Sequence, residues 1–127
     1  MLQSATDLMT RRALDGMAAR HRAYTDNIAN VDTPGYSAKQ VHFEEQLRSV
    51  RDALASNPKN QTQIEQLPFT LEATPEAQTT ARPDGNTVAI DDQVVLLEKN
   101  RLAYEALIQT TRLRQEILHN AITETPR

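Results

Sequence analysis

Asn27-Ile28-Ala29-Asn30-Val31-Asp32-Thr33-Pro34-Gly35-Tyr36 is the stretch that decides how this chain begins to fold. An apolar repeat with helical spacing runs into it, and its last residues stop that helix. Pro34-Gly35 suits the centre of a type II turn, because proline sets φ at the first central position and glycine supplies φ > 0 at the second. Thr33 precedes a proline and is pushed out of the helical region, while Asn30 is a candidate left-handed cap. The stretch therefore predicts that a helix ends near residues 29–31 and that the chain then turns sharply.

The helix before this turn, predicted over residues 1–31, carries a seam in which spacings of three and four alternate. This spacing is the a/d pattern of a coiled coil. Gly16 interrupts the helix, at a cost of about 1 kcal/mol relative to alanine. The seam consists of Leu14, Met17, His21, Tyr24, Ile28 and Val31.

A second, longer helix is predicted over about residues 89–122, after a turn at residues 84–87. Its seam has the same alternating spacing, but polar residues interrupt it, which favours more than one packing partner. The seam consists of Val94, Leu97, Arg101, Tyr104, Ile108, Thr111, Gln115, Leu118 and Ile122.

Between the long helices, residues 43–55 are predicted to form a short amphipathic helix. Residues 56–86 are rich in proline and polar residues, with a weak strand pattern over residues 67–73. We therefore expect a mainly α fold in which the two long helices pack as an antiparallel coiled coil, with a partly extended or disordered middle. The expected segments of this single domain are residues 1–36, 37–86 and 87–127.

Composition limits what such a chain can do. Its 127 residues are 39% hydrophobic but only 4% aromatic, without tryptophan, so a large globular core is not expected. The formal net charge of −3 gives no reason to expect nucleic acid as a partner. Cysteine is absent, which excludes disulfides and thiolate chemistry.

No catalytic or ligand-binding pattern stands out. The three histidines are scattered without metal-type spacing, and the three glycines do not form a phosphate-binding loop. The acidic pairs Glu44-Glu45 and Asp91-Asp92 point in different directions on a helix, which favours solvation or capping. We therefore expect no enzyme activity, cofactor, metal or small-molecule ligand. No apolar run approaches the roughly 18 residues of a membrane span, and no secretory signal peptide is recognisable at the N-terminus.

Asn27-Ile28-Ala29-Asn30 followed by Thr33-Pro34-Gly35-Tyr36 resembles the Asn-x-Ala-Asn-x-x-Thr-Pro-Gly-Tyr signature of bacterial flagellar rod, hook and hook-associated proteins. Residues 37–47 look like the segment that follows the signature in proximal rod proteins of the FlgB type. Residues 84–88 and 98–107 resemble the C-terminal region of the same proteins. The resemblance covers both terminal thirds of the chain.

This resemblance implies a structural subunit of the flagellar basal body rod. Such subunits assemble through their terminal helices into a helical tube that transmits motor torque and encloses the export channel. The implied partners are other copies of the chain, other rod subunits, the rod adapter protein and the membrane-supramembrane ring. The implied location is the periplasmic rod, reached through the flagellar type III export apparatus without a cleaved signal. The implied turn residues are Asn27, Asn30, Thr33, Pro34, Gly35 and Tyr36.

Two other classes of protein are alternatives to a rod subunit. A soluble coiled-coil adaptor would use the same seams to bind one partner helix reversibly. A small hydrolase would need a convergent polar pocket, which cannot be assembled from these residues. The rod subunit accounts for more of the sequence than either alternative, because it also explains the turn signature.

Overall fold

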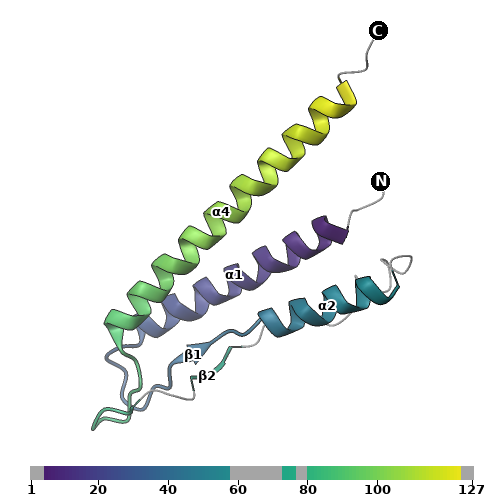
Figure 1. Ribbon diagram of the computed structural model, residues 1–127. Coiled ribbons are helices and arrows are strands. Elements are labelled where there is room, and N and C mark those ends of the chain that lie inside the picture. The colour runs from purple at the N-terminus through teal and green to yellow at the C-terminus, as the bar shows by residue number, and fades with distance from the viewer. Residues whose placement is uncertain (1–4, 58–72, 77–79, 124–127) are drawn as a thin grey trace.

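The computed structural model describes residues 5–57, 73–76 and 80–123 of the chain. Within these residues, three helices and a short two-stranded sheet form the fold (Figure 1). The prediction of a mainly α fold with a long helix toward each end is confirmed. The elements are α1 (Ala5–Ala29), β1 (Lys39–Gln40), α2 (Glu44–Ser56), β2 (Thr74–Pro75) and α4 (Ile90–Thr123).

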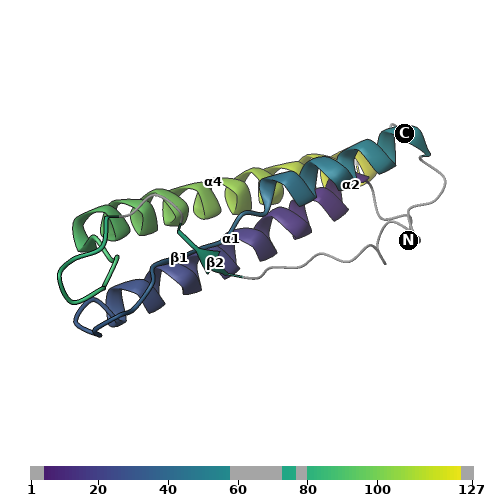
Figure 2. The same cartoon turned by 90° about the horizontal axis from the view of Figure 1, so that it is seen from below.

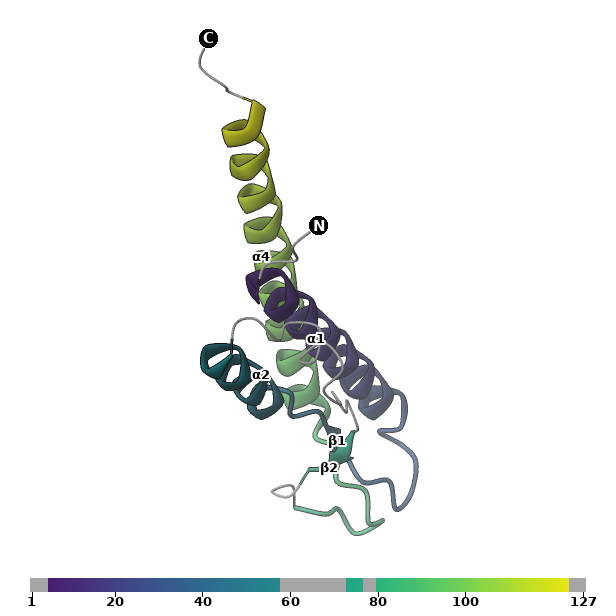
Figure 3. The same ribbon diagram turned by 90° about the vertical axis from the view of Figure 1, so that its right-hand side faces the viewer.

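The two long helices pack against each other in opposite directions, as expected from their seams. The side chain of Asp7, near the start of α1, forms a 2.8 Å ion pair with Arg114 in the second half of α4. At the other end, the side chain of Asn27 donates a 2.8 Å hydrogen bond to Gln93 in the first turn of α4. Because α4 has 34 residues and α1 has 25, the end of α4 projects beyond the start of α1 (Figures 1 and 3).

A second face of α1 is lined by small residues that allow the chain after the turn to lie close to the helix. Ala19 and Ala23 are buried with Val41. One turn earlier, Gly16 lies under the ring of Phe43, where a Cβ atom would come within 2.3 Å of the ring. Gly16, which lowers the helix propensity of α1, therefore leaves the space that the buried ring of Phe43 fills.

Helix α2 lies alongside the first half of α1 (Figure 1). Leu8 of α1 forms a small apolar cluster with Val50 and Leu54 of α2. The spacing of four between the two α2 residues places both on one face of that helix. Helix α1 is thus the middle element of the fold, with α4 and α2 on different faces.

The sheet consists of two antiparallel strands of two residues each. Lys39 lies opposite Pro75, and Gln40 opposite Thr74. The N–H of Glu76 adds a 2.7 Å hydrogen bond to the carbonyl of Ala38. The pairing joins β2, in the middle of the chain, to β1, which follows the turn at residues 33–36. The sequence analysis did not predict β1. Most of the predicted strand, residues 67–72, lies outside the described residues.

One sequence-based prediction is wrong. Asn30 was expected to adopt a left-handed conformation, but among the described residues only glycines have a positive φ. Its N–H bonds to the carbonyls of Asp26 and Asn27 at 3.1 and 3.2 Å, which continues the helical pattern. Its side chain donates to the carbonyl of Asp26 at 2.8 Å, so the helix end does not need a left-handed residue.

We predict that Gly16→Ala lowers the free energy of unfolding by about 1–3 kcal/mol, because the new methyl group must displace the ring of Phe43. At an ordinary helical position the same change would stabilise the chain by roughly 1 kcal/mol. The measurement is urea denaturation followed by far-UV circular dichroism. In a Phe43→Ala background the loss should disappear, and an equal loss in both backgrounds would contradict the assigned contact.

Candidate functional site

Two turns lie together at the end of the helix pair where α1 finishes and α4 begins (Figures 1 and 2). In the first turn, the N–H of Tyr36 donates to the carbonyl of Thr33 across 3.3 Å, and Gly35 has a φ of 72°. This positive φ at the second central residue is what a type II turn requires. In the second turn Gly85 has a φ of 80°. The N–H of Gly35 donates to the carbonyl of Asp84 at 2.9 Å, which bonds one turn to the other.

Asn27 is fully buried and joins three parts of the chain. Its Nδ2 donates to the carbonyl of Lys39 and to Oε1 of Gln93, both at 2.8 Å. Its Oδ1 accepts from the N–H of Lys39 at 2.8 Å and from the hydroxyl of Tyr36 at 3.2 Å. The amide thus binds both backbone groups of one residue of β1, as a neighbouring strand would. Both of its hydrogens and both lone pairs of its oxygen have partners.

Asn86 is also fully buried and closes the end of α1. Its Nδ2 donates to the carbonyls of Thr33, Asn30 and Val31, at 2.7, 3.0 and 3.1 Å respectively. Its Oδ1 accepts from the N–H of Val88 at 2.7 Å. The last carbonyls of a helix and those just beyond it have no partner inside the helix. One side chain from the loop before α4 therefore caps the helix end that the signature creates.

Two more buried amides lie on α4, and the sequence analysis missed both. Gln93 is 1% exposed and accepts the bond from Asn27, while Asn100 is 7% exposed and donates to the carbonyl of Met17 at 2.9 Å. They stand one position before Val94 and Arg101 of the predicted seam. Their spacing of seven residues was the available signal, but a pattern scored on hydrophobicity passes over amides.

Arg20 holds the chain between β1 and α2 against α1. Its guanidinium donates to the carbonyl of Val41 at 3.0 and 3.1 Å and to both carboxylate oxygens of Glu44 at 2.6 and 2.7 Å. It also lies 4.4 Å from the centre of the Phe43 ring. Burial opposes ionisation of Glu44, but the hydrogen bond and charge of Arg20 hold the pKa of this carboxyl below its ordinary value. Burial raises the pKa of the Tyr24 hydroxyl.

The predicted seam residues lie at different depths in the structure. On α4, Gln93 and Asn100 are buried, one position before Val94 and Arg101 of the predicted seam. Arg101 stays on the surface because it forms ion pairs with two carboxylates of its own helix. Tyr24 is buried, and the half-buried seam residues are Leu14, Met17, Ile28, Val31, Leu97, Tyr104, Ile108 and Thr111. The exposed seam residues are His21, Val94, Arg101, Gln115, Leu118 and Ile122.

A second apolar stripe runs along the face of α4 that points away from α1. Its residues recur at spacings of seven, eleven and four, which keep them on one side of a helix. Each is more than half exposed, between 51% and 59%. We call this set the outer stripe: Val95, Leu102, Leu113 and Ile117.

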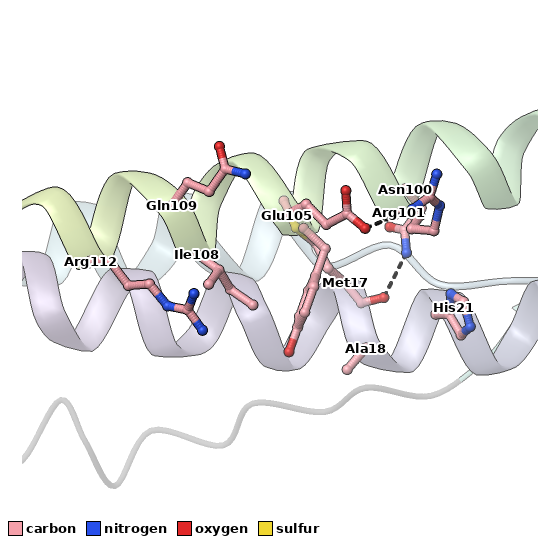
Figure 4. A pocket seen from close by; sticks show the side chains of 10 residues that line it. Met17, Ala18, His21, Asn100, Arg101, Glu105, Ile108, Gln109 and Arg112 are labelled. Carbon is pink, nitrogen blue, oxygen red and sulfur yellow. Dashed lines mark hydrogen bonds and ion pairs between the residues drawn. The ribbon is translucent and has the colours of Figure 1, made fainter.

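A groove of about 510 Å³ follows one side of the contact between α1 and α4. Figure 4 shows Met17, Ala18 and His21 on the α1 side, with Ile108 and Arg112 directed toward α1 from α4. We call it the α1–α4 groove. Its apolar lining is half-buried and its rim is polar. The α4 residues that line it are Asn100, Arg101, Tyr104, Glu105, Ile108, Gln109 and Arg112.

Within residues 5–57, 73–76 and 80–123, no three histidine, aspartate or glutamate side chains lie close enough together to hold a metal ion. None of the described helices is both long and apolar enough to cross a membrane. The described site consists of hydrogen-bonded amides and apolar helix faces. The amides fix the positions of the secondary-structure elements, and the apolar faces are suited to packing against other helices.

Comparison with known proteins finds relatives that share one name. The flagellar basal body rod protein FlgB of Escherichia coli strain K12 is 32% identical over 105 residues, which cover 75% of this chain and 76% of the relative. FlgB of Borrelia hermsii is 32% identical over 108 residues, covering 76% and 79%. FlgB of Bacillus subtilis strain 168 is 27% identical over 110 residues, covering 85% of each chain.

The chain belongs to the FlgB family of flagellar basal body rod proteins. The resemblance drawn from the signature is thereby confirmed. No family model matches the chain. In this FlgB family member, polar residues of the signature form bonds inside their own subunit. Asn27 binds β1 and α4, Asn30 binds the last turn of α1, and the hydroxyl of Tyr36 binds Asn27.

We predict that Asn27→Asp lowers the free energy of unfolding by about 3 kcal/mol or more. An aspartate keeps the shape but cannot donate both bonds, and its ionised form would face the oxygens of Lys39 and Gln93. The readout is the urea midpoint. Asn30→Asp is the matched control, because its single side-chain donation lies at the surface. Equal losses for the two variants would argue against the role assigned to the buried Asn27 side chain.

Gly35 supports a second prediction, based on the backbone alone. A Cβ atom added there would meet no atom within 4 Å apart from its chain neighbours, so the φ of 72° is the main obstacle to substitution. Gly35→Val should cost about 1–2 kcal/mol, the strain of a left-handed residue. Gly35→Asn should cost clearly less, because asparagine tolerates this region. Thermal melting of the two variants measures the difference, and melting at the same temperature would refute it.

Proposed function

We propose that the chain is a structural subunit of the flagellar basal body rod and that its terminal helices pack with those of other subunits into a helical tube. Membership of the FlgB family supports the rod assignment. The tube is supported by one observation above all. Helix α4 carries apolar side chains on two opposite faces, and within the described residues α1 covers only one of them.

The outer stripe is the second of these faces. Contiguous apolar surface that a single chain leaves uncovered is typical of sites for protein–protein contact. When such contacts join different patches of identical subunits and do not close into a ring, they generate a helical assembly. The long stripe on a straight helix fits this kind of packing better than it fits a site for a small ligand.

The proposal gives the buried amide hydrogen bonds between α1 and α4 a mechanical role. Torque applied to one long helix must reach the other without the pair sliding apart. The buried bonds from Asn27 to Gln93 and from Asn100 to Met17 oppose such sliding, since a shift along either axis would break them. We infer that many such stiffened pairs side by side transmit motor torque around an export channel.

The proposed partners follow from the family resemblance. They are further copies of this chain, other rod subunits, the rod adapter protein and the membrane-supramembrane ring. We propose that the chain reaches the periplasmic rod through the flagellar type III export apparatus. The proposal assigns it no catalytic role and no cofactor. A soluble coiled-coil adaptor is the competing function, and it differs in forming a one-to-one complex away from the basal body.

The outer stripe provides the test. Changing Leu102 and Leu113 together to glutamine should leave the isolated chain folded, because both side chains are more than half exposed. It should remove the chain from purified basal bodies and stop swimming when the variant replaces the wild-type chain. Immunoblots of basal bodies and swimming assays give the readouts.

The matched control is Ser49→Gln, an exposed position on α2 away from the outer stripe. It should assemble normally. Wild-type swimming by the Leu102→Gln, Leu113→Gln variant would contradict a role for the outer stripe. Absence of the wild-type chain from basal bodies would contradict the rod assignment, and a discrete soluble complex with one partner would favour the adaptor.

A further inference from the structure

The last turns of α4 form a projection that is apolar and uncovered by the described part of the chain. We call residues 113–123 the α4 tip. Leu118 follows Thr111 of the α1-facing seam by seven residues and therefore continues that face. Leu118 is 50% exposed and Ile122 is 77% exposed. Both follow Arg114, which pairs with Asp7 near the start of α1. The end of α4 therefore extends beyond the start of α1 (Figure 3).

The α1–α4 groove is the complementary shape on the same molecule. Its lining includes the half-buried side chains of Met17, Tyr104 and Ile108, which offer an apolar surface to an incoming group. The groove and the tip are thus both apolar, and both continue the contact face between α1 and α4.

The tip cannot reach the groove of its own chain. Ile108 and Leu118 are ten residues apart on one straight helix, which separates them by about 15 Å. We propose that the α4 tip of one copy docks in the α1–α4 groove of a second copy. This inference rests on the proposed rod function and specifies which surfaces of neighbouring subunits meet.

In the head-to-tail form of this contact, the two copies are not related by a twofold axis, so each pair keeps one free tip and one free groove. The contact then extends from copy to copy in one direction. It would also shelter the part of the α1-facing seam that projects beyond Asp7. Val95 and Leu102 of the outer stripe lie outside the α4 tip and stay available for lateral neighbours.

The absence of cysteine makes disulfide trapping a clean test. The first test chain carries Leu118→Cys in the tip and Gln109→Cys on the groove rim, and the second carries Ile122→Cys with His21→Cys. Residues 109 and 118 lie about 13 Å apart along α4. A disulfide requires Cα atoms within about 7 Å, so any bond that forms in the first chain joins two copies.

Each chain replaces the wild type, basal bodies are isolated and mildly oxidised, and cross-links are resolved on non-reducing gels. We expect a ladder of dimers, trimers and longer species from a test pair, and none from either single variant. Leu118→Cys with Ser49→Cys is the control pair, because Ser49 is exposed on α2 away from the groove. It should give no ladder.

Basal bodies that contain the test chains without a ladder would overturn the docking arrangement and leave the rod function intact. A dimer from Leu118→Cys alone would also overturn it, because it would show that two tips meet each other. If the control pair enters basal bodies and neither test pair does, the docking arrangement is again rejected, since a small exposed cysteine should not prevent it. Absence of the wild-type chain from basal bodies would instead reject the proposed function.

Discussion

The bond between the buried amides of Asn27 and Gln93 is the contact on which the rest of the structure depends. It joins the end of α1 to the start of α4, and Asn27 also binds both backbone groups of Lys39. A buried amide with all its partners is tolerated, but one that loses a partner costs about 1–3 kcal/mol. Sliding either helix by one turn would break these bonds. They therefore set the register of the helix pair and fix where the chain leaves it.

Polar contacts have this importance because the apolar core is thin. Three of the ten buried hydrophobic residues in the described part of the chain are alanines. In contrast, the eight large hydrophobic residues that are exposed there all lie on α4. The described part of the chain thus buries few large hydrophobic side chains and leaves eight of them exposed on α4. This distribution suits a subunit whose assembly, rather than its folding alone, covers the long helix.

The sequence predicted the elements well and the contacts between them less well. The helix stop near Ala29 and the positive φ at Gly35 follow from local rules, and the antiparallel pairing of the long helices was predicted from their apolar seams. The buried positions Gln93 and Asn100 did not, because a seam is read from hydrophobicity and an amide counts as polar. Gly16 was taken for a defect of the helix, since its role depends on Phe43, which is 27 residues away in the chain.

The sequence by itself determined where the helices begin and end, where the chain turns and which faces are apolar. These features depend on φ preferences and on the spacing of residues along one segment. The tertiary structure decided which polar groups are buried together, which face of α1 receives Phe43, and which part of α4 stays uncovered. Those outcomes depend on hydrogen bonds and steric fit between segments far apart in the chain. Local propensity holds no information about such partners until the helices pack.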